Sequence, residues 1–138
     1  MNKSDFQFLG YHISKINCEI KDSYDPEKIR ISQTIEVRQN YFQEEKRFVE
    51  VVMDVKLKSE DESFYFFISM KGRFRGGDDM PQEIFERFSG RNAPAIMYPF
   101  VRSIITSYTA QANIPPVILP TVNFASKHDS QEDNNGNN

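Results

Sequence analysis

The chain has 138 residues, one cysteine and a formal net charge of −3, which fits one domain with a buried core and excludes an internal disulfide framework. The negative charge argues against nucleic acid as the main partner, because phosphate binding needs a basic stripe. The N-terminus lacks an apolar signal region and no run approaches the roughly 18 apolar residues of a membrane span, so we expect a cytoplasmic protein without membrane insertion.

The first expected strand covers residues 6–20. Its apolar positions change parity along the segment, from Tyr11 and Ile13 to Ile16, Cys18 and Ile20. Successive side chains of a strand point to opposite faces, so this change predicts a bulge between Ile13 and Ile16.

Residues 29–38 and 49–58 are the next two expected strands, and both alternate between apolar and polar side chains. The apolar sets are Ile29, Ile31, Ile35 and Val37 in the first and Val49, Val51, Met53, Val55 and Leu57 in the second. Such alternation is typical of strands with one solvated face.

Residues 64–74 form the fourth expected strand, which is apolar on both faces at its start. Phe64 and Phe66 lie on one face, and Tyr65 and Phe67 lie on the other. One helix cannot bury both faces, and a large exposed apolar surface favours aggregation. We therefore expect the chain to pack against another copy of itself, as a homodimer or homotetramer.

Two helical segments are expected after the strands. Residues 81–88 suggest a short helical turn, and the apolar residues of 96–108 recur at the spacing of one helical face. Proline lacks an N–H group and is tolerated in a first turn but not deep inside a helix. Pro94 and Pro99 therefore predict a long helix that begins between residues 95 and 99 and ends near 112 or 113.

These elements predict an α+β fold in which a four-stranded antiparallel sheet carries a long helix, plus a short helical turn, on one face. An apolar arm, residues 114–124, follows the helix. We expect one domain over residues 1–124 and a disordered polar tail over residues 125–138, which has no apolar anchor.

Few residues suggest chemistry. His12 and Cys18 could form a base–nucleophile pair only on one strand face, and the expected bulge favours an inert buried cysteine instead. No metal-ligand spacing or phosphate-binding loop is present, because residues 72–77 match such a loop only in glycine content. The sequence predicts no catalytic residue, no metal and no cofactor.

The stretch IMYPFVR, residues 96–102, and the arm IPPVILPTVNF, residues 114–124, resemble the signature of the SecB family of export chaperones, ILFPYAR and FPxLxLxPVNF. Residues 1–124 are accordingly expected to form a SecB-like domain. The resemblance implies an ATP-independent holdase that binds unfolded polypeptides in apolar grooves. Its clients would be preproteins for export or, as in the branch of toxin–antitoxin systems, an antitoxin polypeptide.

Two sets of site residues go with this resemblance. The client-binding candidates, chosen for apolarity and position, are Tyr65, Phe67, Phe74, Ile114, Val117 and Leu119. The alternative for all six is ordinary core or subunit interface. The candidates for partner docking are the acids Glu19, Glu50 and Asp54, and a solvated strand face is the alternative for the last two.

The chain departs from the family pattern at several positions. Gln111 and Ala112 stand where the family has Arg-Gly before the arm. Some members dock the translocation motor SecA through acids, of which Glu19 keeps one, while Lys15 and Phe67 occupy others. SecA stays a candidate partner through Glu19, and the replaced acids count against it.

Two other functions fit parts of the sequence. An adaptor or structural oligomer with one dedicated protein partner would need the same apolar surfaces. A small-molecule enzyme of the hot-dog type would also combine a sheet with a helix, but there the helix comes early, between strands, and here it follows four strands.

Overall fold

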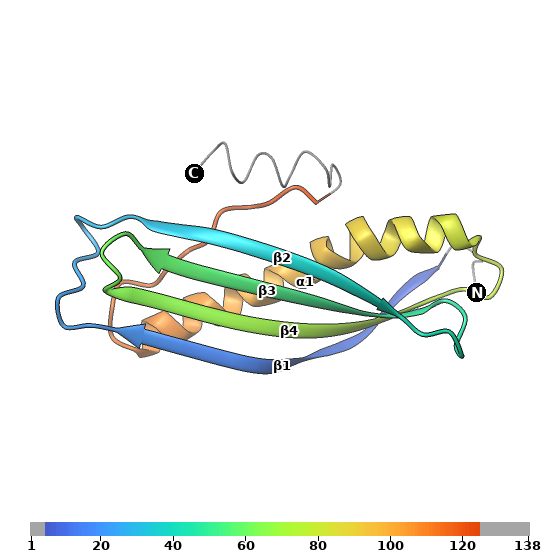
Figure 1. Ribbon diagram of the computed structural model, residues 1–138, viewed down its shortest axis with the longest axis horizontal. Coiled ribbons are helices and arrows are strands. Elements are labelled where there is room, and N and C mark those ends of the chain that lie inside the picture. The colour runs from blue at the N-terminus through green and yellow to red at the C-terminus, as the bar shows by residue number, and fades with distance from the viewer. Residues whose placement is uncertain (1–4, 125–138) are drawn as a thin grey trace.

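The computed structural model describes residues 5–124, which fold into four strands and one helix (Figure 1). In chain order these are β1 (Phe6–Ile20), β2 (Ile31–Tyr41), β3 (Phe48–Ser59), β4 (Phe64–Gly76) and α1 (Gln82–Gln111). Every strand expected from the sequence is present within a few residues of its expected ends, and the α+β fold with α1 on one face of the sheet is confirmed. The tail of residues 125–138, expected to be disordered, lies outside the described residues.

The strands form one antiparallel sheet in the order β1-β4-β3-β2. The hairpins β2–β3 and β3–β4 join neighbours, whereas residues 21–30 run across the end of the sheet and place β1 and β2 at opposite edges (Figure 1). The predicted bulge is confirmed as a register shift between Ile13 and Lys15. A second shift follows Phe8, at Gly10, whose φ of 124° is a conformation that only glycine adopts readily.

The core lies between α1 and the two central strands. All the side chains that β3 and β4 direct toward α1 are fully buried, whereas those of the edge strands β1 and β2 are only partly buried. A single helix is therefore wide enough to cover two strands of this sheet but not four. The strip of sheet on each side of α1 needs another cover.

The helix differs from the expectation. The separate helical turn over residues 81–88 is wrong, because α1 runs without interruption through Pro94 and Pro99. A proline inside a helix costs about 3 kcal/mol in isolation. Here Pro94 is itself buried, between Phe85 and Met97 along the side of α1 that packs on the sheet. Tertiary burial of this helix face outweighs the local cost, which the residue pattern alone could not show.

Candidate functional site

The apolar face of α1 divides into two rows of side chains. Met97, Val101 and Ile105, four residues apart, have no exposed surface. The adjacent row is Phe100, Ile104 and Tyr108, of which Phe100 is 39% and Tyr108 41% exposed. The second row is thus a shoulder of the helix that the sheet does not cover.

This shoulder lies beside β1. The ring of Phe100 is 5.8 Å from that of Phe8 and 5.0 Å from that of Tyr11, centroid to centroid. Further along β1, Ile16 is 37% exposed on the face that carries α1. We call this partly exposed surface the apolar stripe and define it by Phe8, Tyr11, Ile16, Phe100, Ile104 and Tyr108.

On the β2 side of α1, the arm folds back along the helix and supplies a cover. The Tyr98 hydroxyl donates a 2.6 Å hydrogen bond to the Pro120 carbonyl, and burial raises the pKa of Tyr98, which keeps it a donor. The Val117 N–H donates to Thr109 Oγ1 at 2.9 Å, and Thr106 Oγ1 donates to the Val117 carbonyl at 2.8 Å. The arm thereby covers the β2 side of α1 along the C-terminal half of the helix, whereas Tyr41, at the far end of β2, is 42% exposed.

The client-binding candidates of the arm lie at different depths. Leu119 is 4% exposed and belongs to the core, and Ile114 and Val117 pack partly against it. Ile118, which was not among the candidates, is 75% exposed. The arm therefore presents an apolar side chain outward while its neighbours hold it in place.

The candidates from β4 do not lie together. Tyr65 and Phe67 are half-buried on the sheet face opposite α1, which we call the open face. Phe74 lies on the other face, fully buried, with its ring stacked 5.1 Å from that of Phe8. Phe74 therefore cannot share one surface with Tyr65 and Phe67, because its position differs from theirs by nine and seven, and an odd difference along a strand means opposite faces.

The open face is polar and densely charged. Its charged side chains are the cations Lys15, Arg38, Lys56, Lys58, Lys71, Arg73 and Arg75 and the acids Glu19, Glu36, Glu50 and Asp54. All three acids predicted for docking, Glu19, Glu50 and Asp54, are therefore on this face. Lys15, which stands at a position where the resemblance places an acid, lies with its Nζ 5.8 Å from the centroid of the Phe67 ring.

Asp54 is the most constrained of these acids. Its Oδ2 accepts a hydrogen bond of 2.9 Å from Arg38, and its side chain is 17% exposed. Its Oδ1 is buried and accepts no hydrogen bond from the part of the chain that the structure describes. Asp54 is thus engaged by Arg38 of the neighbouring strand, whereas Glu19 is exposed and Glu50 is half-buried.

The pair considered for catalysis is separated by the sheet. His12 pairs with Lys71 on the open face, and Cys18 pairs with Phe66 on the face that carries α1. Burial, and to a smaller extent the Glu19 carboxylate, raise the pKa of the Cys18 thiol, which disfavours the reactive thiolate. Over residues 5–124, no group of three or more His, Cys, Asp or Glu side chains is placed to hold a metal ion. Within the same residues, α1 is too polar to cross a membrane.

Comparison with known proteins agrees with this geometry. The family model "Preprotein translocase subunit SecB" matches residues 13–135. An uncharacterized protein of Methanocaldococcus jannaschii is 31% identical over 89% of this chain and 82% of its own length. The protein-export protein SecB of Neisseria meningitidis is 28% identical over 62% of this chain and 57% of its own length, so the match leaves much of that relative uncovered.

Among solved structures, a SecB-like chaperone of Mycobacterium tuberculosis in complex with a ChAD peptide from the HigA1 antitoxin superposes with a TM-score of 0.71. The superposition covers 85% of this chain and 90% of that chain at 12% identity, and it shows a common fold. The four-stranded sheet with its long helix thus gives the described residues the fold of the SecB-like chaperones. With the family model spanning most of its length, the chain belongs to the SecB family.

None of the six residues of the apolar stripe was predicted as a site from the sequence. The missed residues are Ile16, Phe100, Ile104 and Tyr108 together with Phe8 and Tyr11. A signal was present, because the apolar sector of 96–108 holds six residues, Met97, Phe100, Val101, Ile104, Ile105 and Tyr108, which is broader than one row. A helix with so wide an apolar face is either deeply buried or leaves part of that face exposed. The position of β1 at the edge of the sheet, beside β4, was needed to distinguish the two cases.

Proposed function

We propose that the protein is an ATP-independent holdase that binds apolar segments of unfolded polypeptides on the apolar stripe. The observation that supports this is the row of half-exposed side chains on α1 and β1, which continues the core without being covered by it. Phe100 and Tyr108 each expose about two fifths of their surface while their rings stay fixed against Tyr11 and Phe66. Rigid aromatic side chains bind with little loss of side-chain entropy.

Binding would depend on the hydrophobic effect and on backbone pairing. Burial of apolar surface stabilises a complex by about 25 cal/mol per Å² before the costs of association, whatever the order of the client's residues. The outer edge of β1, 15 residues long, also borders the stripe and can pair with an extended client strand. Both contributions are insensitive to sequence, which suits a chaperone with many clients.

The class of client is proposed from the relatives. Curated relatives are named protein-export proteins, and the solved SecB-like chaperone holds an antitoxin peptide. We propose that this chain likewise binds unfolded preproteins or an antitoxin-type segment, as a homodimer or homotetramer in which several stripes act on one client. The exposed Ile118, with the partly buried Ile114 and Val117, would extend the client surface along the arm.

Light scattering tests the proposal. A denatured client is diluted into buffer with increasing amounts of the protein, with and without ATP. The proposal predicts that aggregation falls as the protein approaches stoichiometry with the client and that ATP makes no difference. Unchanged aggregation of several unrelated clients at a large excess would contradict it, and co-purification of a single folded partner would favour the dedicated adaptor.

A further inference from the structure

The open face carries a surplus of positive charge that the rest of the chain does not share. Seven cations and four acids of the strands point to it, a surplus of three on a chain whose net charge is −3. The remainder of the molecule therefore has a net charge of −6. The strands thus give the open face a local surplus of positive charge, with the loop acids Glu45 and Glu62 at its ends, and such a surplus can steer a charged partner.

Most of these cations lack a counter-charge. Over residues 5–124 two ion pairs form, Arg38 with Asp54 and Arg75 with Glu45. Of the seven cations of the open face, five therefore remain without a carboxylate of the described residues within 4.0 Å. Three of them, Lys15, Lys56 and Lys58, lie beside the half-buried rings of Tyr65 and Phe67 on the neighbouring strands, whereas Lys71 and Arg73 lie further along β4.

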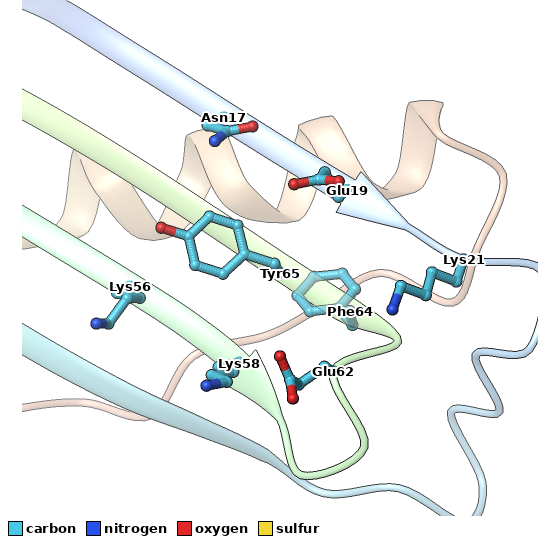
Figure 2. A pocket seen from close by; sticks show the side chains of 8 residues that line it. All are labelled: Asn17, Glu19, Lys21, Lys56, Lys58, Glu62, Phe64 and Tyr65. Atoms are coloured by element: carbon cyan, nitrogen blue, oxygen red, sulfur yellow. The ribbon is translucent and has the colours of Figure 1, made fainter.

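One end of this face is hollowed. A shallow depression of about 440 Å³ lies over the ends of β1, β3 and β4. Figure 2 shows the Tyr65 ring between Lys56 and Lys58 along β3 and Glu19 along β1. Lys21 and the acid Glu62 complete the charged lining, which therefore holds three cations and two acids. An aromatic wall with ammonium groups at its rim can hold an aromatic or aliphatic side chain flanked by carboxylates.

We propose that the open face docks an acidic polypeptide segment, with Tyr65, Lys56 and Lys58 as its main contacts. This surface is separate from the apolar stripe, from which the thickness of the sheet divides it. The four acids of the face favour a polypeptide over a nucleic acid. Spaced carboxylates can avoid Glu19, Glu36 and Glu50, whereas a continuous phosphate backbone would run against them.

Fluorescence anisotropy of labelled peptides tests this inference on the full chain. The probe contains Glu, Asp, Gly and Ser around one Phe, and the comparison peptide has Gln and Asn in place of the acids. We expect the acidic peptide alone to bind, and its affinity to fall as salt rises. The double variant Lys56→Glu with Lys58→Glu should bind the acidic peptide about tenfold more weakly, because two exposed charge pairs are lost and replaced by like charges.

A matched variant controls for net charge. Arg87→Glu with Arg91→Glu makes the same change on exposed positions of α1 and should leave peptide affinity unaltered. Lys56→Arg with Lys58→Arg should retain binding, and circular dichroism should show that each variant is folded. Equal binding of the neutral peptide, an equal loss in the α1 variant, no binding of the acidic peptide, or tighter lysine-dependent binding of an oligodeoxythymidine would overturn the proposal.

Discussion

The hydroxyl of Tyr98, on α1, donates a hydrogen bond of 2.6 Å to the carbonyl of Pro120, in the arm. The same hydroxyl lies within hydrogen-bond distance of the Gln33 side-chain amide on β2. One side chain thus joins the helix, the arm and an edge strand. It explains why the arm lies over the β2 side of α1 and not over the β1 side.

Removing this hydroxyl should loosen the arm. Tyr98→Phe removes the hydrogen bonds that the hydroxyl of Tyr98, a residue only 3% exposed, makes with the Pro120 carbonyl and Gln33. We therefore expect the free energy of unfolding in urea to fall by about 1–2 kcal/mol. Tyr108→Phe is the matched control, because the ring contact with Phe66 remains and no hydrogen bond of that hydroxyl is seen within the described residues. Equal stability of the Tyr98→Phe and wild-type proteins would contradict the prediction.

The two threonines that hold the arm, Thr109 and Thr106, should contribute different amounts to the stability of the fold. Thr109→Val keeps the shape of a fully buried side chain but leaves the Val117 N–H without its acceptor, so we expect a loss of about 1–3 kcal/mol. Thr106→Val removes a donor to the Val117 carbonyl at a half-exposed position where water can replace it, and should cost about 0.5–1 kcal/mol. Urea unfolding of both variants checks the order, and the reverse order would refute this account of the arm.

Two glycines of β4 should respond differently to alanine. A methyl group at Gly76 would lie 2.8 Å from the Phe85 ring, which is fixed in the core, so Gly76→Ala should destabilise by about 1–3 kcal/mol. A methyl group at Gly72 would meet the flexible end of Met97, 2.9 Å away, which can rotate aside. Thermal unfolding should therefore show a clear loss for Gly76→Ala and a smaller one for Gly72→Ala.

A double variant separates the clash at Gly76 from a general effect of alanine in the strand. Combined with Phe85→Leu, Gly76→Ala should cost less than the sum of the two single changes, because the smaller side chain makes room. Strict additivity of the two changes would show that the Phe85 ring is not the cause.

The strands were predictable because alternation in β2 and β3 and the change of parity in β1 are local signals. The start of α1 was not predictable from the sequence. A proline inside a helix has a local cost, and only the tertiary burial of Pro94 offsets it. The pairing of β1 with β4 was equally invisible in the pattern. A strand that is apolar on one face can lie at an edge or at the centre, and the loop of residues 21–30 permits either.

The candidate site was predictable in kind but not in position. The chain has more apolar residues than one helix can bury, which indicated a binding surface. The family resemblance indicated that this surface belongs to a chaperone. Tyr65 and Phe67 were chosen as the second face of β4, yet much of the exposed apolar surface is the shoulder of α1 beside β1, including Phe100 and Tyr108. Deciding which half of a broad apolar sector is buried requires knowing the width of the sheet beneath it.

The turn between β3 and β4 should make stability depend on pH. Ser63 and Ser59 donate hydrogen bonds to Asp61 Oδ1, which lowers the pKa of this carboxyl below its ordinary 3.8. A carboxyl with a lowered folded-state pKa stabilises the fold above its unfolded pKa and loses that contribution as pH falls through the folded value. The free energy of unfolding, measured in urea as the pH is lowered from 5 to strongly acidic values, should therefore fall more steeply for the wild-type protein than for Asp61→Asn. Parallel curves would contradict this.

The central claim, that the apolar stripe holds unfolded polypeptides, is tested most directly by site-specific photocrosslinking. A photoreactive benzoylphenylalanine is placed at one of three positions: Tyr108, Phe67 on the open face, or Glu83 in the first turn of α1, which serves as a background control. Each protein is then irradiated together with a reduced, alkylated client that cannot refold. We predict strong crosslinks to the client from position 108 and background yield from position 83, with position 67 reporting whether the open face also takes part. Client crosslinking from position 108 no higher than from position 83, or crosslinks from 108 that join two copies of this chain instead, would contradict the claim.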